Sequence, residues 1–162
     1  MAVDPVTYEP LTKRIIGAAI EVHRHLGPGL LESVYQECLA RELAAHRLSF
    51  VTQQSTRVSY KGVQLAASFR LDLVVEGLVV VEIKSVTAIS AIHQAQALTY
   101  MRIADCPVGL VINFNVPRLI DGVKRLVNAR VGENRGDAGA EETKVRRISG
   151  TEDERSRNNF KD

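Results

Sequence analysis

The sequence predicts a mixed α/β domain in which a β-sheet is flanked by helices. Two segments with apolar residues at three- and four-residue steps come first. A group of strand-like segments follows, and a third helical segment precedes a short, nearly continuous apolar run. The chain of 162 residues is long enough for about one such domain. A content of 45% hydrophobic and 25% charged residues excludes collagen-like and wholly disordered chains.

Two helices are expected at the start of the chain. The first follows Pro10 and ends at Gly27-Pro28-Gly29. Its apolar face comprises Ile15, Ile16, Ala19, Ile20, His23 and Leu26. The second runs roughly from Leu30 to His46. Its apolar face comprises Leu31, Val34, Tyr35, Cys38, Leu39 and Leu43.

Strands dominate the middle of the chain. Residues 50–60 are rich in β-branched and polar residues and end at a Lys61-Gly62 turn. Two strands, 69–75 and 78–85, flank Glu76-Gly77, and residues 88–104 form a helix free of Gly and Pro. The apolar run 108–114 is typical of a strand buried on both faces. The segment 119–127 is ambiguous between strand and helix.

The composition changes near residue 128. Residues 129–162 hold eight basic and eight acidic side chains and few large apolar ones, so we expect a charged, disordered tail. Residues 1–128 form the folded domain and carry the whole net charge of +2, which argues neither for nor against a nucleic-acid partner. We see no membrane helix, no secretory signal and no metal-finger spacing at Cys38 and Cys106. A cytoplasmic protein is expected.

Charged side chains interrupt two otherwise apolar strands. Glu82 and Lys84 share one face of the strand 78–85, and Asp72 interrupts the strand 69–75. A two-residue loop between these strands would place Asp72 and Glu82 on different faces. A three-residue loop, 76–78, with Gly77 in a left-handed conformation, pairs them directly, and we predict this odd loop.

Facing carboxylates repel each other unless a cation lies between them or one is protonated. Oxygen donors without His or Cys nearby suit Mg²⁺ or Mn²⁺, and Lys84 could position a water or stabilise phosphate charge. The alternative is a cross-strand cluster of ion pairs, Arg70 and Asp72 with Glu82 and Lys84, on a solvated face.

The polar residues of the third predicted helix, 88–104, indicate that it forms one wall of a pocket. Its predicted apolar stripe includes three hydrogen-bonding residues, His93, Gln96 and Tyr100, which need partners if buried. His93 alone would more often be a core histidine. Glu32 also projects into the apolar arc of its helix, although Glu42 projects closer to the centre of that arc.

The segment Gly29-Leu30-Leu31-Glu32-Ser33-Val34-Tyr35 resembles the motif of the GxxExxY proteins, which belong to the PD-(D/E)XK nuclease superfamily. Asp72 followed by Glu82-Ile83-Lys84 resembles the superfamily's core motif, with Leu71 where proline is usual. Residues 96–100 resemble its QxxxY helix, and residues 109–114 its late strand.

This resemblance implies a restriction-endonuclease-like fold and a set of site residues. Asp72 and Glu82 would bind Mg²⁺ or Mn²⁺, with the Ile83 carbonyl as a further donor. Glu32 would be another metal ligand or would orient a metal-bound water. Lys84 would position the attacking water, while Gln96 and Tyr100 would contact phosphate or brace the site.

We therefore expect a Mg²⁺-dependent nuclease that acts on DNA rather than RNA. Two alternatives remain: a non-catalytic nucleic-acid-binding or adaptor protein with the nuclease fold, and a different phosphoryl or small-molecule enzyme. By analogy, a homodimer is possible. The candidate basic residues for a nucleic-acid surface are Arg57, Lys61, Arg70, Arg118, Lys124 and Arg125.

Overall fold

The computed structural model of the chain describes residues 5–129. The helices are η1 (Pro5–Tyr8), α1 (Glu9–Leu26), α2 (Glu32–Ala45), α3 (Ala91–Ile103) and η2 (Leu119–Gly122). The strands are β1 (Phe50–Tyr60), β2 (Val63–Val75), β3 (Val79–Lys84), β4 (Val108–Asn113) and β5 (Val123–Val127). The predicted mixed α/β fold is confirmed. The predicted tail lies outside the described residues, except for Ala129.

The five strands form one sheet in the order β1-β2-β3-β4-β5. All neighbouring strands are antiparallel except β3 and β4, which are parallel and connected through α3. Every residue of β4 is buried, as the apolar run predicts for a central strand. The ambiguous segment after β4 forms the short helix η2 and then the edge strand β5.

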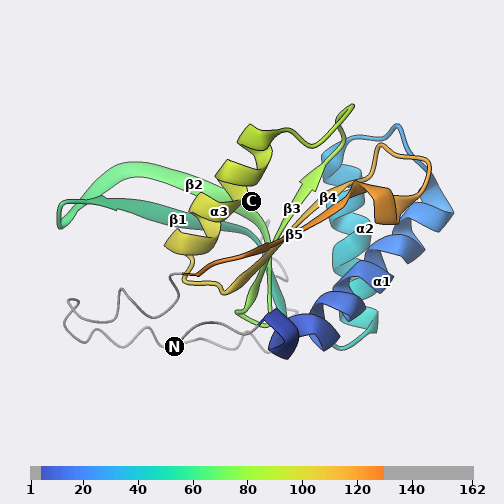
Figure 1. Ribbon diagram of the computed structural model, residues 1–162, viewed down its shortest axis with the longest axis horizontal. Coiled ribbons are helices and arrows are strands. Elements are labelled where there is room, and N and C mark those ends of the chain that lie inside the picture. Colours follow the sequence, from blue (N-terminus) through green and yellow to red (C-terminus); the bar gives the residue numbers. More distant parts are fainter. Residues whose placement is uncertain (1–4, 130–162) are drawn as a thin grey trace, which may run out of the picture.

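Helices cover both faces of the sheet (Figure 1). α1 and α2 pack on one face, where Ile15 and Leu39 belong to the larger core cluster together with Ile83 and Ile112. α3 packs on the other face, where Met101 lies against Leu71 and Val80. This contact is close, because a Cβ at Gly109 of β4 would lie 2.5 Å from Met101 Sδ. Burial also raises the pKa of the Cys106 thiol, in the same cluster, to about 11.

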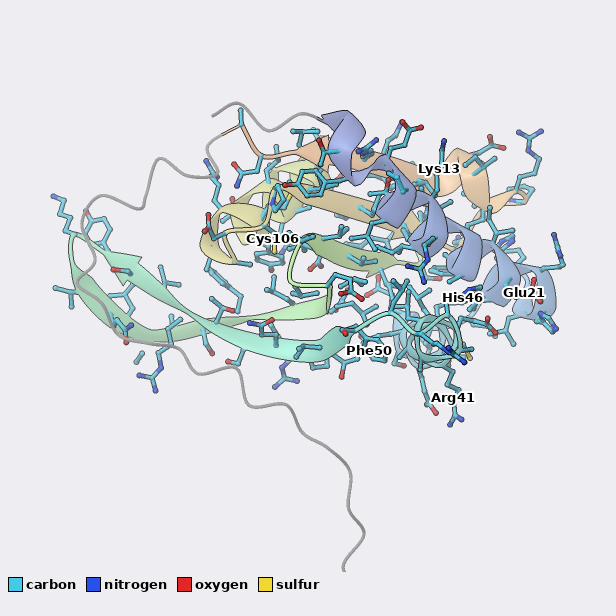
Figure 2. The ribbon with its side chains drawn as sticks, turned by 90° about the horizontal axis from the view of Figure 1, so that it is seen from below. Lys13, Glu21, Arg41, His46, Phe50 and Cys106 are labelled. Carbon is cyan, nitrogen blue, oxygen red and sulfur yellow. The ribbon has the colours of Figure 1, made fainter. Side chains whose placement is uncertain are left out.

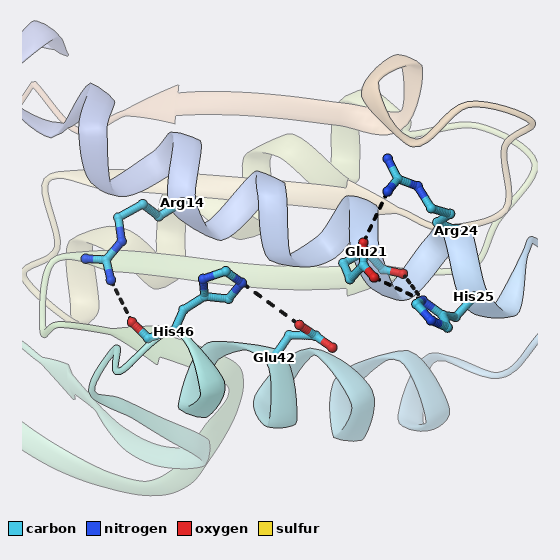
Figure 3. A network of polar contacts seen from close by, with 6 residues as sticks. All are labelled: Arg14, Glu21, Arg24, His25, Glu42 and His46. Atoms are coloured by element: carbon cyan, nitrogen blue, oxygen red, sulfur yellow. Dashed lines mark hydrogen bonds and ion pairs between the residues drawn. The ribbon is translucent and has the colours of Figure 1, made fainter.

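A hydrogen bond links α1 to the end of α2, and other polar contacts lie within each helix or at its end (Figure 3). The Arg14 guanidinium donates a 2.7 Å hydrogen bond to the carbonyl of His46, which follows α2. Glu42, the second inward candidate on α2, has its carboxylate 4.0 Å from the His46 ring. Glu42 therefore contacts the end of its own helix.

Two expectations about the elements are wrong. β2 begins at Val63 and not at Phe69, so the β1–β2 hairpin is longer than predicted. On α3 the buried residues are Ala97 and Met101, while Ile92 is 72% exposed and Gln96 is also exposed. Because α3 packs on the sheet through the face that carries Ala97 and Met101, the side of the predicted stripe with Ile92 and Gln96 faces solvent. None of the helices described between residues 5 and 129 is long and apolar enough to cross a membrane.

Candidate active site

The turn between β2 and β3 brings two carboxylates together. Glu76 and Gly77 adopt left-handed φ values of 53° and 65°, and Val75 pairs with Val79. The predicted odd loop is therefore confirmed. Paired residues continue to Leu73 and Val81, and one further step in this register brings Asp72 opposite Glu82. The parity of the hairpin thus sets up the site.

The strand alternation breaks at Asp72. Leu73 and Val75 pack in the α1/α2 core, but Leu71 packs with Val74 and Val80 under α3. Regular alternation would put Leu71 on the same face as Leu73, but the break places Leu71 on the α3 side. The neighbouring β1 residue is Gln53, and its φ of 51° marks the same irregularity. At this break the Asp72 Oδ2 atom accepts a 2.9 Å hydrogen bond from the Ile83 amide of β3.

Glu82 is buried with incomplete hydrogen bonding. The residue is only 5% exposed. Among the described residues, its Oε1 atom has no hydrogen-bond partner. Burial raises the pKa of Glu82 to about 8, and the negative charge of Asp72 adds to the increase. Burial also raises the pKa of Asp72 above its ordinary value. The pair therefore favours binding a proton or a cation.

Lys84 follows Glu82 on the same strand face and is half-buried. Its positive charge lowers the pKa of both Asp72 and Glu82, although burial outweighs this effect at each carboxyl group. Within residues 5–129, neither Lys84 nor Arg70 forms an ion pair with these carboxylates at 4.0 Å or less. The geometry therefore does not support the alternative of a cross-strand ion-pair cluster.

Glu32 is the first residue of α2 and faces the end of β3. Its Oε1 atom accepts a 3.2 Å hydrogen bond from the Ser85 amide, and Ser85 Oγ donates to the Leu30 carbonyl at 2.6 Å. The charge of Glu32 raises the pKa of Asp72 and Glu82, so the three carboxylates share one electrostatic environment. Glu32 is nevertheless held by the backbone of the β3 end.

Gln96 and Tyr100 lie one turn apart on α3, and Gln96 Nε2 donates a 2.9 Å hydrogen bond to the Tyr100 hydroxyl. The Tyr100 ring contacts Phe69 of β2 with a centroid distance of 5.3 Å. Burial, followed by the charges of Glu82 and Asp72, raises the pKa of Tyr100. Tyr100 therefore lies within electrostatic reach of the acidic pair, and Gln96 is connected to the pair only through Tyr100.

His93 does not join this pocket wall. Its Nδ1 atom accepts a 3.0 Å hydrogen bond from the Ser90 amide, and the Ser90 side chain accepts one from the His93 amide. The two residues form a capping box at the start of α3. The expectation that His93 lines a pocket with Gln96 and Tyr100 is wrong, because its ring is used to begin the helix.

Sequence reasoning missed three supporting residues. Gln53 lowers the pKa of Asp72, and its Nε2 atom donates a 2.6 Å hydrogen bond to Gln36 Oε1 of α2. Asn113 is 1% exposed, and its side chain bonds both the amide and the carbonyl of Val86, which fixes the loop after β3. Tyr35 was expected on the apolar face of its helix and as the last residue of the GxxExxY-like segment, but no hydrogen bond was expected of it; its hydroxyl donates to the Gly27 carbonyl and accepts from the amide of Leu30. An amide side chain inside the otherwise apolar run 108–114 was the available signal for Asn113.

The donor set of the acidic pair fits a hard divalent cation. Two carboxylates with no His or Cys suit Mg²⁺ or Mn²⁺, and Glu82 Oε1 is a buried oxygen that needs a positive partner. Among residues 5–129, no group of three or more His, Cys, Asp or Glu could hold a metal ion. A two-carboxylate site remains compatible with Mg²⁺, which keeps several waters and uses one or two protein carboxylates.

A protein-family model described as the PD-(D/E)XK nuclease superfamily matches residues 9–126. This range extends from the first residue of α1 into β5 and includes all six predicted site residues. No curated protein and no solved structure matches the chain in the same comparisons.

Proposed function

The chain belongs to the PD-(D/E)XK nuclease superfamily, and from this premise we propose that it hydrolyses phosphodiester bonds in a reaction that requires Mg²⁺ or Mn²⁺. The proposed substrate is DNA in preference to RNA, and the proposed subgroup is the GxxExxY proteins. The proposed catalytic domain comprises residues 1–128, which end just after β5.

One observation carries the proposal. Asp72 and Glu82 come together where the β2–β3 ladder ends, and the buried Glu82 Oε1 atom has no hydrogen-bond partner among the described residues. A fold that needed only stability would rarely retain a buried carboxylate facing a half-buried one, because desolvating a buried ion costs on the order of several kcal/mol. Binding a divalent cation would compensate both charges.

Asp72 and Glu82 would hold the cation, with the Ile83 carbonyl as a further donor. When bound, the cation would lower the pKa of a coordinated water and neutralise phosphate charge. Lys84, next to the pair on the same strand face, is proposed to position the attacking water and to stabilise negative charge that develops on the phosphoryl oxygens.

The remaining residues are proposed to shape the site. Glu32 already accepts the Ser85 amide, which favours a role in orienting water over direct ligation. The hydrogen bond that Gln96 donates to the Tyr100 hydroxyl holds that hydroxyl near the acidic pair, where either residue could contact the substrate phosphate. These proposed roles concern individual side chains, which membership of the superfamily alone does not specify.

A cleavage assay tests the proposal. Labelled single- and double-stranded DNA and RNA are incubated with the wild-type protein, Lys84→Ala and Lys13→Ala, with Mg²⁺, with Mn²⁺ and with chelator. Lys13 is a matched control, because it lies on α1 and pairs with Glu9. We expect the wild type and the control to cleave DNA with metal, and Lys84→Ala to be slower by about 100-fold or more.

Three results would contradict this proposal. Cleavage that persists in Lys84→Ala, or that continues in chelator, would contradict the assigned roles. Binding of nucleic acid without cleavage of any substrate would favour the non-catalytic binding protein. Size-exclusion chromatography of the same samples would show whether the active species is a monomer or the proposed homodimer.

A further inference from the structure

The β1–β2 hairpin extends well beyond the rest of the sheet (Figures 1 and 2). β1 and β2 have 11 and 13 residues, whereas β3 pairs with β2 only from Val79 to Val81. We call residues 55–70 the arm. At about 3.3 Å per residue, the six β1 residues from Ser55 to Tyr60 span roughly 20 Å. Figure 2 shows Phe50 at the base of this hairpin and the arm directed away from it.

The arm has one polar and one apolar face. In the register, Ser55 pairs with Arg70 and Arg57 with Ser68, and after an irregularity Ser59 pairs with Gln64. Because paired residues share a face and alternate residues return to it, these six side chains lie on one face. The opposite face carries Thr56, Val58, Tyr60, Val63, Leu65 and Phe69. It is turned toward α3, since Phe69 contacts Tyr100.

The polar face is cationic. The sequence contains no Asp or Glu between Glu42 and Asp72, so no acidic side chain offsets Arg57 and Arg70 within the arm. Both arginines are exposed, and in the described part of the chain neither pairs with a carboxylate. Lys61 adds a further positive charge at the tip of the arm, where its Nζ lies 5.5 Å from the centroid of the Tyr60 ring and so not on the polar face. The other polar-face side chains are neutral hydrogen-bonding groups.

We propose that the arm lies in the major groove of a B-form DNA duplex, with its polar face toward the bases and phosphates. The inference rests on the proposed function, because it assumes that nucleic acid is the ligand. The major groove is about 12 Å wide and admits a two-stranded β-ribbon. Arginine and glutamine are side chains that bind base edges there, while serine hydroxyls and lysine can contact phosphates.

The same geometry favours DNA over RNA. The major groove of an A-form RNA duplex is deep and narrow, so side chains cannot read it. The arm continues directly into the strand segment that carries Asp72. A duplex held along the arm would therefore lie next to the strand segment that carries Asp72, and the arm would select duplex DNA. A second copy of the chain is a poorer occupant of the polar face, because two like-charged faces would repel each other.

The test measures binding of a 24-base-pair DNA duplex and of the RNA duplex of the same sequence, in chelator, so that cleavage does not interfere. Arg57→Ala/Arg70→Ala is compared with the wild type and with Lys13→Ala/Arg41→Ala. In Figure 2 the two control residues, Lys13 and Arg41, lie on the part of the molecule away from the arm. Circular dichroism melting confirms that every variant folds.

We expect the arm variant to bind the DNA duplex about tenfold or more weakly than the wild type and the control. The slope of log K against log salt should fall by up to about two units, one for each lost phosphate contact. The wild type should prefer the DNA duplex to the RNA duplex, and the arm variant should lose most of that preference. Arg57→Lys/Arg70→Lys should keep the salt slope while losing part of the affinity.

Unchanged DNA binding in the arm variant would overturn the inference, as would equal wild-type binding of the two duplexes. A changed oligomeric state in the arm variant, with DNA binding retained, would identify the arm as an interface between copies. These failures differ from failure of the proposed function. DNA binding that depends on the arm, without any cleavage, would support the proposed role of the arm and contradict the proposed nuclease activity. DNA cleavage by the arm variant at the wild-type rate would support the nuclease activity and contradict the role of the arm.

Discussion

Glu82 couples the stability of the domain to pH. Its pKa of about 8 lies well above the ordinary value of 4.5 because the carboxyl is buried beside Asp72. Between these two pH values the folded chain holds a proton that the unfolded chain releases. The free energy of unfolding therefore decreases as pH rises from about 4.5 to about 8. The raised pKa of Asp72 acts in the same direction.

Thermal unfolding in chelator at several pH values checks this prediction. The Tm of the wild type should fall by several degrees between pH 5.5 and pH 8, and Glu82→Gln should remove most of that decrease. Glu37→Gln is a suitable control, because the Glu37 side chain is 70% exposed on α2. A Glu82→Gln protein with the same pH slope as the wild type would contradict the assigned burial effect.

Tyr35 fixes the segment that presents Glu32. Its hydroxyl bonds the backbone of Gly27 and Leu30, and its ring stacks on Phe114 with a centroid distance of 4.4 Å. Tyr35→Phe keeps the ring but leaves these backbone groups without their partner. We expect a loss of about 1–2 kcal/mol in urea unfolding and a lower cleavage rate, because the loop before Glu32 would loosen.

Tyr60→Phe provides the matched control for Tyr35. Tyr60 is 60% exposed on the arm, and removal of its hydroxyl should leave the free energy of unfolding within about 0.5 kcal/mol of the wild type. Equal stability of Tyr35→Phe and the wild type would show that the two hydrogen bonds do not restrain the loop.

At the level of the elements, the approach of α3 to the sheet depends on Gly109 of β4. A Cβ there would lie 2.5 Å from Met101 Sδ, so Gly109→Ala must displace Met101 or the helix. Overpacking of this kind costs about 1–3 kcal/mol, and we expect Gly109→Ala to lower the Tm. Displacement of α3 would also move Gln96 and Tyr100, so cleavage should decrease.

Gly17→Ala is the contrasting substitution. Gly17 lies inside α1, and nothing lies within 4 Å of the Cβ that alanine would add. Alanine is the better helix former by about 1 kcal/mol, so this variant should be more stable than the wild type. Urea unfolding of both glycine variants would check the pair, and equal effects would contradict the packing argument.

The elements also show which parts of the fold local patterns can predict. Runs rich in Val and Ile predicted β3 and β4, and counting loop residues predicted that Asp72 lies opposite Glu82. The first half of β2 was missed because Ala66 and Ala67 are weak strand formers. Their strand conformation comes from pairing of the hairpin as a whole and not from local preference.

The site was predictable where it depends on alternation, and not where it depends on packing. The prediction of which face of α3 packs on the sheet was wrong, because the small side chain of Ala97 lets the helix approach the sheet while apolar Ile92 stays exposed. The roles of Gln53 and Asn113 depend on contacts with Gln36 and Val86, which are distant in sequence. No periodicity within one segment reports such contacts.

For the whole molecule, α2 and α3 meet the acidic pair from opposite faces of the sheet. Glu32 approaches from α2 and Tyr100 from α3, and both act electrostatically with Asp72 or Glu82. The break in alternation at Asp72 makes this arrangement possible, since it turns part of β2 from one face to the other. The site therefore depends on the complete sheet and not on one hairpin.

Cation binding should reverse the pH dependence of the whole domain. A cation that binds only the folded chain stabilises it, by about 2.7 kcal/mol at a concentration 100 times the Kd. This corresponds to a rise in Tm of roughly 5–10 °C for a chain of this size. At pH 8, Mg²⁺ should therefore raise the Tm of the wild type. At pH 5.5 the rise should be much smaller, because a proton competes for Glu82.

Two variants separate the roles of the carboxylates in this Mg²⁺ effect. Asp72→Asn should lose the Mg²⁺-dependent rise in Tm at pH 8, because it removes one of the two proposed ligands. Glu32→Gln should retain most of it if Glu32 orients water through its position at Ser85, and should lose it if Glu32 is itself a ligand. A wild-type Tm that does not respond to Mg²⁺ or Mn²⁺ at pH 8 would contradict the proposed metal site. The buried, unpaired oxygen of Glu82 would then be satisfied by a proton alone.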